Sequence, residues 1–172
     1  MNKIKFLAIL AIAAFSNIAN AQSSATASAT ATIVTPISIT NTADMSFGMI
    51  AVNGSAGTVI LSSDGGTIES GVTLQTGALS TPAKAAGFDV AGTANYGYSI
   101  TIPTGDVTLT NPLNSSTMTI SRFTSSLVGG KSTLNDLGKS SFTVGGTLNV
   151  AAGQVAGVYK NDKAITVTVN YN

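Results

Sequence analysis

Carboxylates are the first side chains of this chain to consider for chemistry. Asp64 and Glu69 flank the glycine turn Gly65-Gly66, and a calcium ion takes about six to eight oxygen ligands. The acidic residues are otherwise scattered along the chain, so none forms the close couple of carboxylates that glycoside hydrolysis needs. We therefore interpret residues 64–69 as a solvated hairpin tip, and we predict neither a catalytic residue nor a metal site.

Several residue types that carry common enzyme chemistry are missing. The chain contains no Cys, no His and no Trp, which excludes a thiol nucleophile, a Ser-His-Asp triad, a histidine base and a Cys/His zinc site. Only 9% of the residues are charged, against roughly 25% in an ordinary soluble protein. This composition argues against a nucleic-acid partner, because phosphate binding relies on clustered Lys and Arg. We predict that the protein is not an enzyme and binds no cofactor.

Aromatic side chains could still stack on a sugar. The chain has four tyrosines, and they lie at Tyr96, Tyr98, Tyr159 and Tyr171. Tyr98 and Tyr171 share the parity of neighbouring apolar residues, so we interpret them first as packing residues of a core. The tyrosines thus keep open a glycan-binding alternative without requiring it.

The first 21 residues have the layout of a secretory signal peptide. Lys3 and Lys5 precede an apolar run over residues 6–15, and Ala19-Asn20-Ala21 forms a small-residue cleavage site. The run is about ten residues long, well short of the roughly 20 that a membrane span needs. We expect an exported protein without a membrane span, located in the periplasm, at the cell surface or in the medium.

After residue 21, apolar and polar residues alternate with the period of two that is typical of strands. The alternating sets are Ile37/Ile39, Val59/Leu61, Phe88/Val90, Tyr98/Ile100/Ile102, Met118/Ile120, Phe142/Val144, Leu148/Val150 and Ile165/Val167/Val169/Tyr171. Turn-forming residues separate them at Asn53-Gly54, Asp64-Gly65-Gly66, Thr104-Gly105-Asp106, Gly129-Gly130, Gly145-Gly146 and residues 160–163. The pattern predicts an all-β, immunoglobulin-like antiparallel β-sandwich over residues 33–172. A closed barrel is the alternative architecture.

Residues 22–32 form an extension rich in Ala, Ser and Thr. A flexible leader is the plain interpretation of such a stretch. The apolar positions nevertheless alternate strictly with Ser and Thr, and they continue into the domain; they are Ala25, Ala27, Ala29, Ala31 and Ile33. Pro36 interrupts this β pattern, and a proline in a strand marks an edge or a break. The extension could therefore pair with something other than its own neighbouring strand.

Several segments together resemble a bacterial exported family. They are residues 31–40 (ATIVTPISIT), 45–48 (MSFG), 98–103 (YSITIP), 118–125, 144–150 (VGGTLNV), 157–159 (GVY) and 165–171. This combination resembles the family of domain of unknown function 4402, over residues 31–172. The closing segment is also similar to that of spore-coat U-type and chaperone–usher pilin subunits, which are extracellular structural proteins.

The resemblance to pilins implies roles for both ends of the mature chain. Pilin subunits end in an alternating strand with a penultimate tyrosine, which a periplasmic chaperone recognises; Ile165, Val167, Val169 and Tyr171 match this pattern. Pilins also tend to carry a glycine where this chain has Tyr159, and its nearest glycine is Gly157. In such subunits an amino-terminal extension completes the sheet of the next subunit, which is strand addition at an open edge.

Two functions follow as hypotheses. The first is an exported, pilin-like or coat-like structural subunit that associates with itself or with other surface subunits by β-strand addition. Its donor residues would be Ala25, Ala27, Ala29, Ala31 and Ile33, and its acceptor edge would lie along residues 165–171. The second is a self-contained sandwich whose loops bind a glycan or a surface protein. The first needs an open edge in the isolated subunit, whereas the second needs a closed sandwich.

Overall fold

The computed structural model of the protein describes residues 22–172. The chain divides into one unit that ends at Ile33 and a second that runs from Val34 to Asn172. In the first unit, residues 22–33 are exposed and have no regular secondary structure. The predicted signal peptide, residues 1–21, lies outside the described residues.

The second unit consists of short β-strands and one 3-10 turn. The strands are β1 (Ser38–Ala43), β2 (Ser46–Phe47), β3 (Met49–Val52), β4 (Gly57–Leu61), β5 (Thr67–Ser70), β6 (Val72–Gln75), β7 (Ala83–Lys84), β8 (Ala86–Ala91), β9 (Gly97–Thr101), β10 (Val107–Thr110), β11 (Thr117–Ser125), β12 (Lys131–Thr133), β13 (Lys139–Val150) and β14 (Thr168–Tyr171), with η1 at Val128–Gly130. Every strand pairing among residues 22–172 is antiparallel. The prediction of an all-β antiparallel fold is confirmed.

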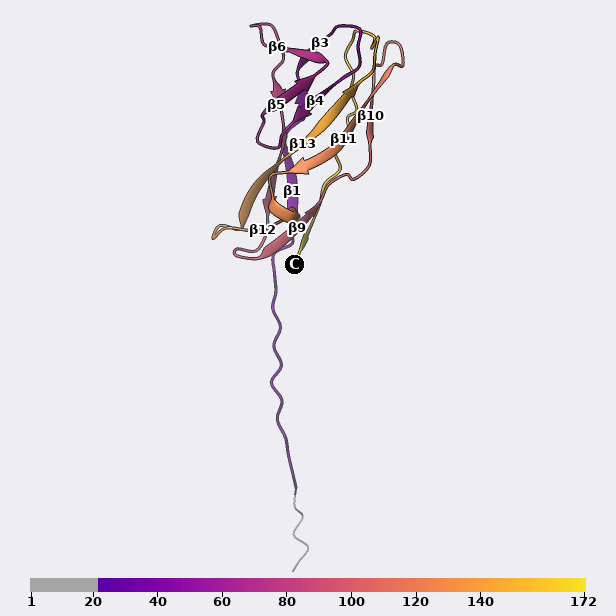
Figure 1. Ribbon diagram of the computed structural model, residues 1–172. Helices are drawn as coiled ribbons and strands as arrows, with labels where there is room; N and C mark the ends of the chain where they lie inside the picture. Colours follow the sequence, from indigo (N-terminus) through magenta and orange to yellow (C-terminus); the bar gives the residue numbers. More distant parts are fainter. Residues whose placement is uncertain (1–21) are drawn as a thin grey trace, which may run out of the picture. The chain divides into compact units, whose positions relative to one another are not determined.

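The largest sheet has seven strands and is organised around β13. Its main order is β1-β8-β13-β11-β10, and β4 and β5 extend it from the second half of β13. Figure 1 shows β13 running from the end of the domain that holds β9 and β12 toward the end that holds β3 to β6. The three-stranded sheet β12-β9-β14 and the pairs β2-β7 and β3-β6 complete the fold.

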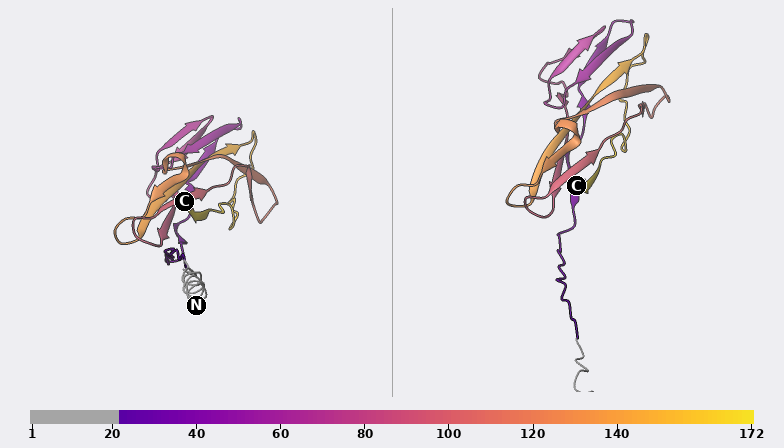
Figure 2. Two further views of the ribbon diagram at one scale, coloured as in Figure 1. Left: turned by 90° about the horizontal axis from the view of Figure 1, so that it is seen from below. Right: turned by 60° about the horizontal axis from the view of Figure 1, so that its bottom comes forward.

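Two hydrophobic clusters pack between these sheets. Figure 2 shows the strands of this unit from two further sides. In one cluster, Val59, Leu61 and Leu148 of the large sheet pack with Phe47 of β2 and Val72 of β6. In the other, the inward side chains of β8 and the first half of β13 pack with Tyr98 of β9 and with Val169 and Tyr171 of β14. Met45 and Phe123 contact both clusters. The large sheet is thus covered by β2 and β6 over one cluster and by β9 and β14 over the other.

Gly145 and Gly146 do not form the predicted turn, because β13 continues through them. On the same side, β13 pairs with β8 up to Val144 and with β4 from Gly146 onward. A Cβ atom on Gly145 would collide with the carbonyl oxygen of Leu61. The glycines therefore allow the backbones to approach closely at the point where β13 changes partner. Close backbone approach is a common reason for a glycine within a strand.

The turn predicted at Asp64-Gly65-Gly66 is confirmed as the β4–β5 hairpin. The backbone N–H of Ser62 donates to the carbonyl of Gly66 at 2.8 Å. The carboxylate of Asp64 accepts a hydrogen bond from the N–H of Gly66 at 3.1 Å. The side chain of Asp64 thus stabilises the turn by bonding to its backbone.

Candidate assembly site

Two edge strands, β1 and β14, border the same hydrophobic cluster. In the described part of the chain, β1 pairs only with β8, and β14 pairs only with β9, and the two edge strands lie beside each other. The residues that these edges direct toward the cluster define what we call the β1–β14 seam: Ile37, Ile39, Ile165, Val167, Val169 and Tyr171.

The seam residues are less well covered than the middle of the core. All six are half-buried, whereas Val90 and Val144, on the inner strands β8 and β13, are 1% and 0% exposed. Each edge strand also has one side without a sheet partner among residues 22–172, so main-chain groups along that side are available for pairing. The seam therefore combines incompletely covered apolar side chains with open strand edges.

The carboxy-terminal residues reach the seam in two ways. Val169 and Tyr171 belong to β14, which pairs with β9 from Thr168 opposite Thr101 to Tyr171 opposite Tyr98. Ile165 and Val167 precede the strand, yet they pack on the same cluster. The predicted alternation of these four residues toward one face is thus present, although the regular ladder starts only at Thr168.

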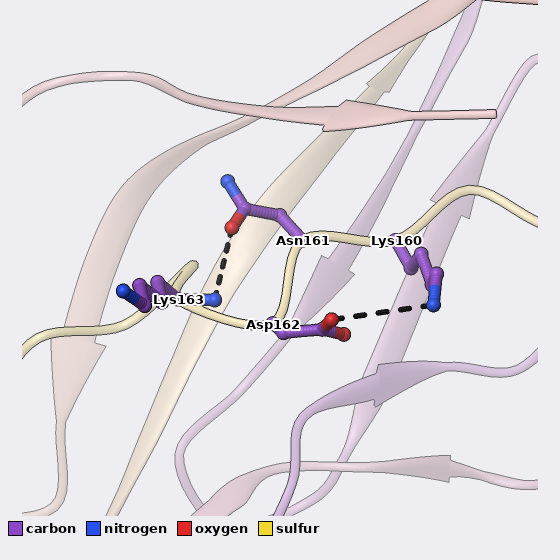
Figure 3. A network of polar contacts seen from close by, with 4 residues as sticks. All are labelled: Lys160, Asn161, Asp162 and Lys163. Atoms are coloured by element: carbon purple, nitrogen blue, oxygen red, sulfur yellow. Dashed lines mark hydrogen bonds and ion pairs between the residues drawn. The ribbon is translucent and has the colours of Figure 1, made fainter. Parts of the chain in front are cut away.

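A turn at residues 160–163 lies between the contact of Lys160 with β10 and the start of β14 (Figure 3). Lys160 forms an isolated bridge with Thr110, after which the side chain of Asn161 donates to the carbonyl of Thr108 at 2.9 Å and accepts from the N–H of Lys163 at 2.9 Å. Lys160 and Asp162 form an ion pair at 4.0 Å, with side chains 60% and 84% exposed. The side chain of Asn161 therefore bonds to β10 where a backbone N–H of a continued strand would do so, and it also stabilises the turn.

Three residues at one end of the seam form a closed ring of hydrogen bonds, which we call the clasp: Thr35, Thr93 and Tyr171. The N–H of Thr35 donates to the hydroxyl of Thr93 at 2.7 Å. The N–H of Thr93 donates to the hydroxyl of Tyr171 at 2.7 Å, and that hydroxyl donates to the carbonyl of Thr35 at 2.6 Å. The clasp joins the segment before β1, the loop after β8 and the end of β14.

The surroundings of Tyr171 leave room for its hydroxyl and support its ring. A Cβ atom on Gly92 would collide with the Tyr171 hydroxyl. The ring of Tyr96 meets that of Tyr171 edge to face, with centroids 5.7 Å apart. The alternation of the last strand placed Tyr171 in the core, but nothing in the sequence pattern indicated Thr35, Thr93 or Gly92, because their contacts are formed between distant segments.

The predicted donor residues are all exposed. Ala25, Ala27, Ala29 and Ala31 form no strand among the described residues, and Ile33 is 96% exposed. The extension thus presents both its apolar and its polar positions to solvent in the single chain.

The remaining tyrosines and carboxylates that the sequence singled out do not belong to the β1–β14 seam. Tyr98 is fully buried and donates to Ser140 at 2.8 Å, and Tyr159 donates to the carbonyl of Val155 at 2.6 Å. Glu69 is exposed on β5. A shallow hollow of about 300 Å³ lies over β8 and β13, where Gly87 has no side chain, and its polar lining comes from Thr42, Asp89, Ser126, Ser141 and Thr143.

Comparison with known proteins identifies a family. The family model described as Domain of unknown function (DUF4402) matches residues 37–171. No curated protein and no solved structure matches the chain. The described residues include no helix with the length and hydropathy of a membrane span.

Proposed function

The chain belongs to the family of Domain of unknown function (DUF4402), and we propose that it is an exported structural subunit of the bacterial cell surface that assembles by β-strand addition. The observation that carries this proposal is the β1–β14 seam. Its two edge strands are open, and its six apolar side chains are half-buried. An added strand would pair with an open edge and would cover these side chains.

The amino-terminal extension of a second copy has the properties of such a strand. Its apolar positions from Ala25 to Ile33 share one parity, so a strand would direct all of them toward one face. Residues 25–33 would span about 30 Å as a strand, and residues 165–171 of the acceptor about 24 Å. The two lengths are therefore comparable, and the extension carries no charge over residues 22–33.

Alanine side chains limit what the extension gains from burial. Each methylene that Ala lacks relative to Val or Leu forfeits about 0.8 kcal/mol of transfer free energy. Main-chain hydrogen bonds to the open edge would then supply much of the specificity, with Ile33 as the one large apolar side chain of the donor. This mode of assembly agrees with a chain that has few charges and many Ser and Thr residues on its strands.

The first experiment compares two chains, residues 22–172 and residues 33–172. Size-exclusion chromatography with light scattering measures their mass, and electron microscopy shows whether filaments form. We expect large assemblies from the longer chain and monomers from the shorter one. If both chains are stable monomers with the same melting temperature, the proposed assembly through the extension is wrong, and the loops become the place to look for a glycan or protein ligand.

Paired substitutions test the face of the donor strand. Ala29→Asp places a charge on the apolar face, whereas Ser28→Asp places the same charge on the polar face. We expect Ala29→Asp to abolish assembly and Ser28→Asp to preserve it, because burial of an unpaired carboxylate is costly. On the acceptor, Val167→Asp and Thr166→Asp form the equivalent pair, since Val167 is half-buried and Thr166 is exposed. Equal effects within either pair would argue against a strand in this orientation.

A further inference from the structure

We propose that the clasp directs the extension toward a second copy of the chain and prevents it from filling the seam of its own domain. This inference rests on the proposed function, because it concerns which seam the donor strand occupies. Its structural basis is the hydrogen-bonded ring of Thr35, Thr93 and Tyr171.

The clasp holds the segment through which the extension enters the domain. Both backbone polar groups of Thr35 are engaged, its N–H with Thr93 and its carbonyl with Tyr171. Pro36 follows, and a proline biases the preceding residue toward extended backbone. Ile37 then packs on the cluster that the seam borders. Residues 35–37 are therefore held from both sides before β1 begins at Ser38.

Filling its own seam would require the extension to reverse direction close to Thr35. Tight reversals between strands rely on Gly, Asn or Asp, which tolerate positive φ. Residues 22–37 contain none of these three residue types. Ile33 and Val34 are β-branched, and positive φ is a strong outlier for such residues. Reversal at Thr35 or Pro36 would instead break the clasp.

The clasp therefore raises the free energy of the self-filled subunit and leaves that of the inter-subunit complex unchanged. Loss of the Tyr171 hydroxyl removes two of the four hydrogen bonds that join these residues, and the two that remain both run between Thr35 and Thr93. Residues 35–37 could then turn back, and the extension could reach its own seam. The predicted result is a shift from links between subunits to links within one subunit.

The test uses the absence of cysteine from the native chain. Ala29→Cys on the extension and Val167→Cys on the acceptor are combined in one chain, and a short bismaleimide reagent joins the thiols. Equal amounts of ¹⁵N-labelled and unlabelled protein are mixed before treatment. Mass spectrometry of the linked peptides then separates links between chains, which mix the isotopes, from links within one chain.

The double-cysteine chain is studied alone and with Tyr171→Phe, Thr93→Val or Tyr159→Phe. Alone, we expect mixed-isotope links to dominate. Tyr171→Phe should raise the ratio of internal to mixed links by about fivefold, the effect of losing one typical hydrogen bond. Thr93→Val removes the hydroxyl that Thr35 contacts and should shift the ratio in the same direction. Tyr159→Phe removes a tyrosine hydroxyl outside the clasp and should leave the ratio unchanged.

Each remaining outcome has a defined meaning. Mixed links that persist unchanged in both Tyr171→Phe and Thr93→Val would overturn the role of the clasp and leave strand addition standing. Internal links that dominate with the clasp intact would overturn it as well. If the thiols of residues 29 and 167 form no link in any of the chains, the proposed function itself fails. Circular dichroism verifies folding, and Thr93→Val decides the question if Tyr171→Phe is unfolded.

Discussion

The hydroxyl of Tyr171 donates a 2.6 Å hydrogen bond to the backbone carbonyl of Thr35, across a separation of 136 positions in the sequence. This contact closes the β-domain between its last strand and the segment that precedes its first strand. The segment before β1 and the end of β14 therefore lie at the same place in the domain.

Tyr171→Phe should reduce the free energy of unfolding by about 1–2 kcal/mol, because it removes a half-buried hydroxyl that makes two hydrogen bonds. Tyr96→Phe is a matched control, since Tyr96 contacts Tyr171 through its ring in a T-shaped pair. Its loss of a hydroxyl should change stability by less than about 0.5 kcal/mol. Urea denaturation of the chain from residue 34 to 172 measures both. Equal losses for the two variants would contradict the clasp as a stabilising feature.

Gly145→Ala should destabilise the domain by about 1–3 kcal/mol, because the new Cβ would collide with the carbonyl of Leu61 where β13 changes partner. Gly105→Ala provides the comparison. A Cβ on Gly105 meets nothing within 4 Å, so this variant should be neutral or slightly stabilising. Thermal unfolding followed by circular dichroism distinguishes the two, and a neutral Gly145→Ala would rule out the tight backbone approach.

Phe142→Ala should cost about 3–5 kcal/mol of unfolding free energy. Phe142 is 3% exposed, and its ring stacks on that of Phe88 with centroids 5.3 Å apart. Val128→Ala should have almost no effect, since Val128 is 94% exposed on the 3-10 turn. Chemical denaturation tests both variants. A small effect of Phe142→Ala would mean that the stacked pair is not at the centre of this cluster.

Asn161→Ala should destabilise the domain more than Asp162→Ala, although the two residues are adjacent (Figure 3). Asn161 makes two side-chain hydrogen bonds to the backbone, and a typical hydrogen bond contributes about 1 kcal/mol. Among residues 22–172, the side chain of Asp162 takes part only in an exposed ion pair at 4.0 Å, and such pairs contribute about 0–1 kcal/mol. Denaturation at low and high salt checks the order, which should hold at both salt concentrations.

Removal of residues 22–33 should leave the melting temperature of the monomer unchanged. The residues of both hydrophobic clusters lie within residues 37–171, and residues 22–33 are exposed. Differential scanning calorimetry at low protein concentration compares the chains that begin at residues 22 and 34. A lower melting temperature for the shorter chain would show that the extension packs on its own domain.

The alternation of apolar and polar residues along short segments was enough to predict much of the fold. Phe88 and Val90, Tyr98, and the series from Ile165 to Tyr171 face the core as their parity predicts, because successive side chains in a strand point to opposite sides. The same rule missed short strands such as β10 (Val107–Thr110) and β6 (Val72–Gln75). Both runs alternate in the same way, Val107 with Leu109 and Val72 with Leu74, so a single alternating pair does not by itself decide which short runs become strands.

Composition and periodicity by themselves determined the all-β class, the parity of the extension and the inward face of the last strand, since each depends only on neighbouring residues. The tertiary structure decided that Gly145 lies within a strand and not in a turn, because only the position of Leu61 gives the reason for a glycine there. It also decided that Thr35, Thr93 and Tyr171 meet. Such contacts depend on how distant strands are brought together, and local alternation carries no information on that placement.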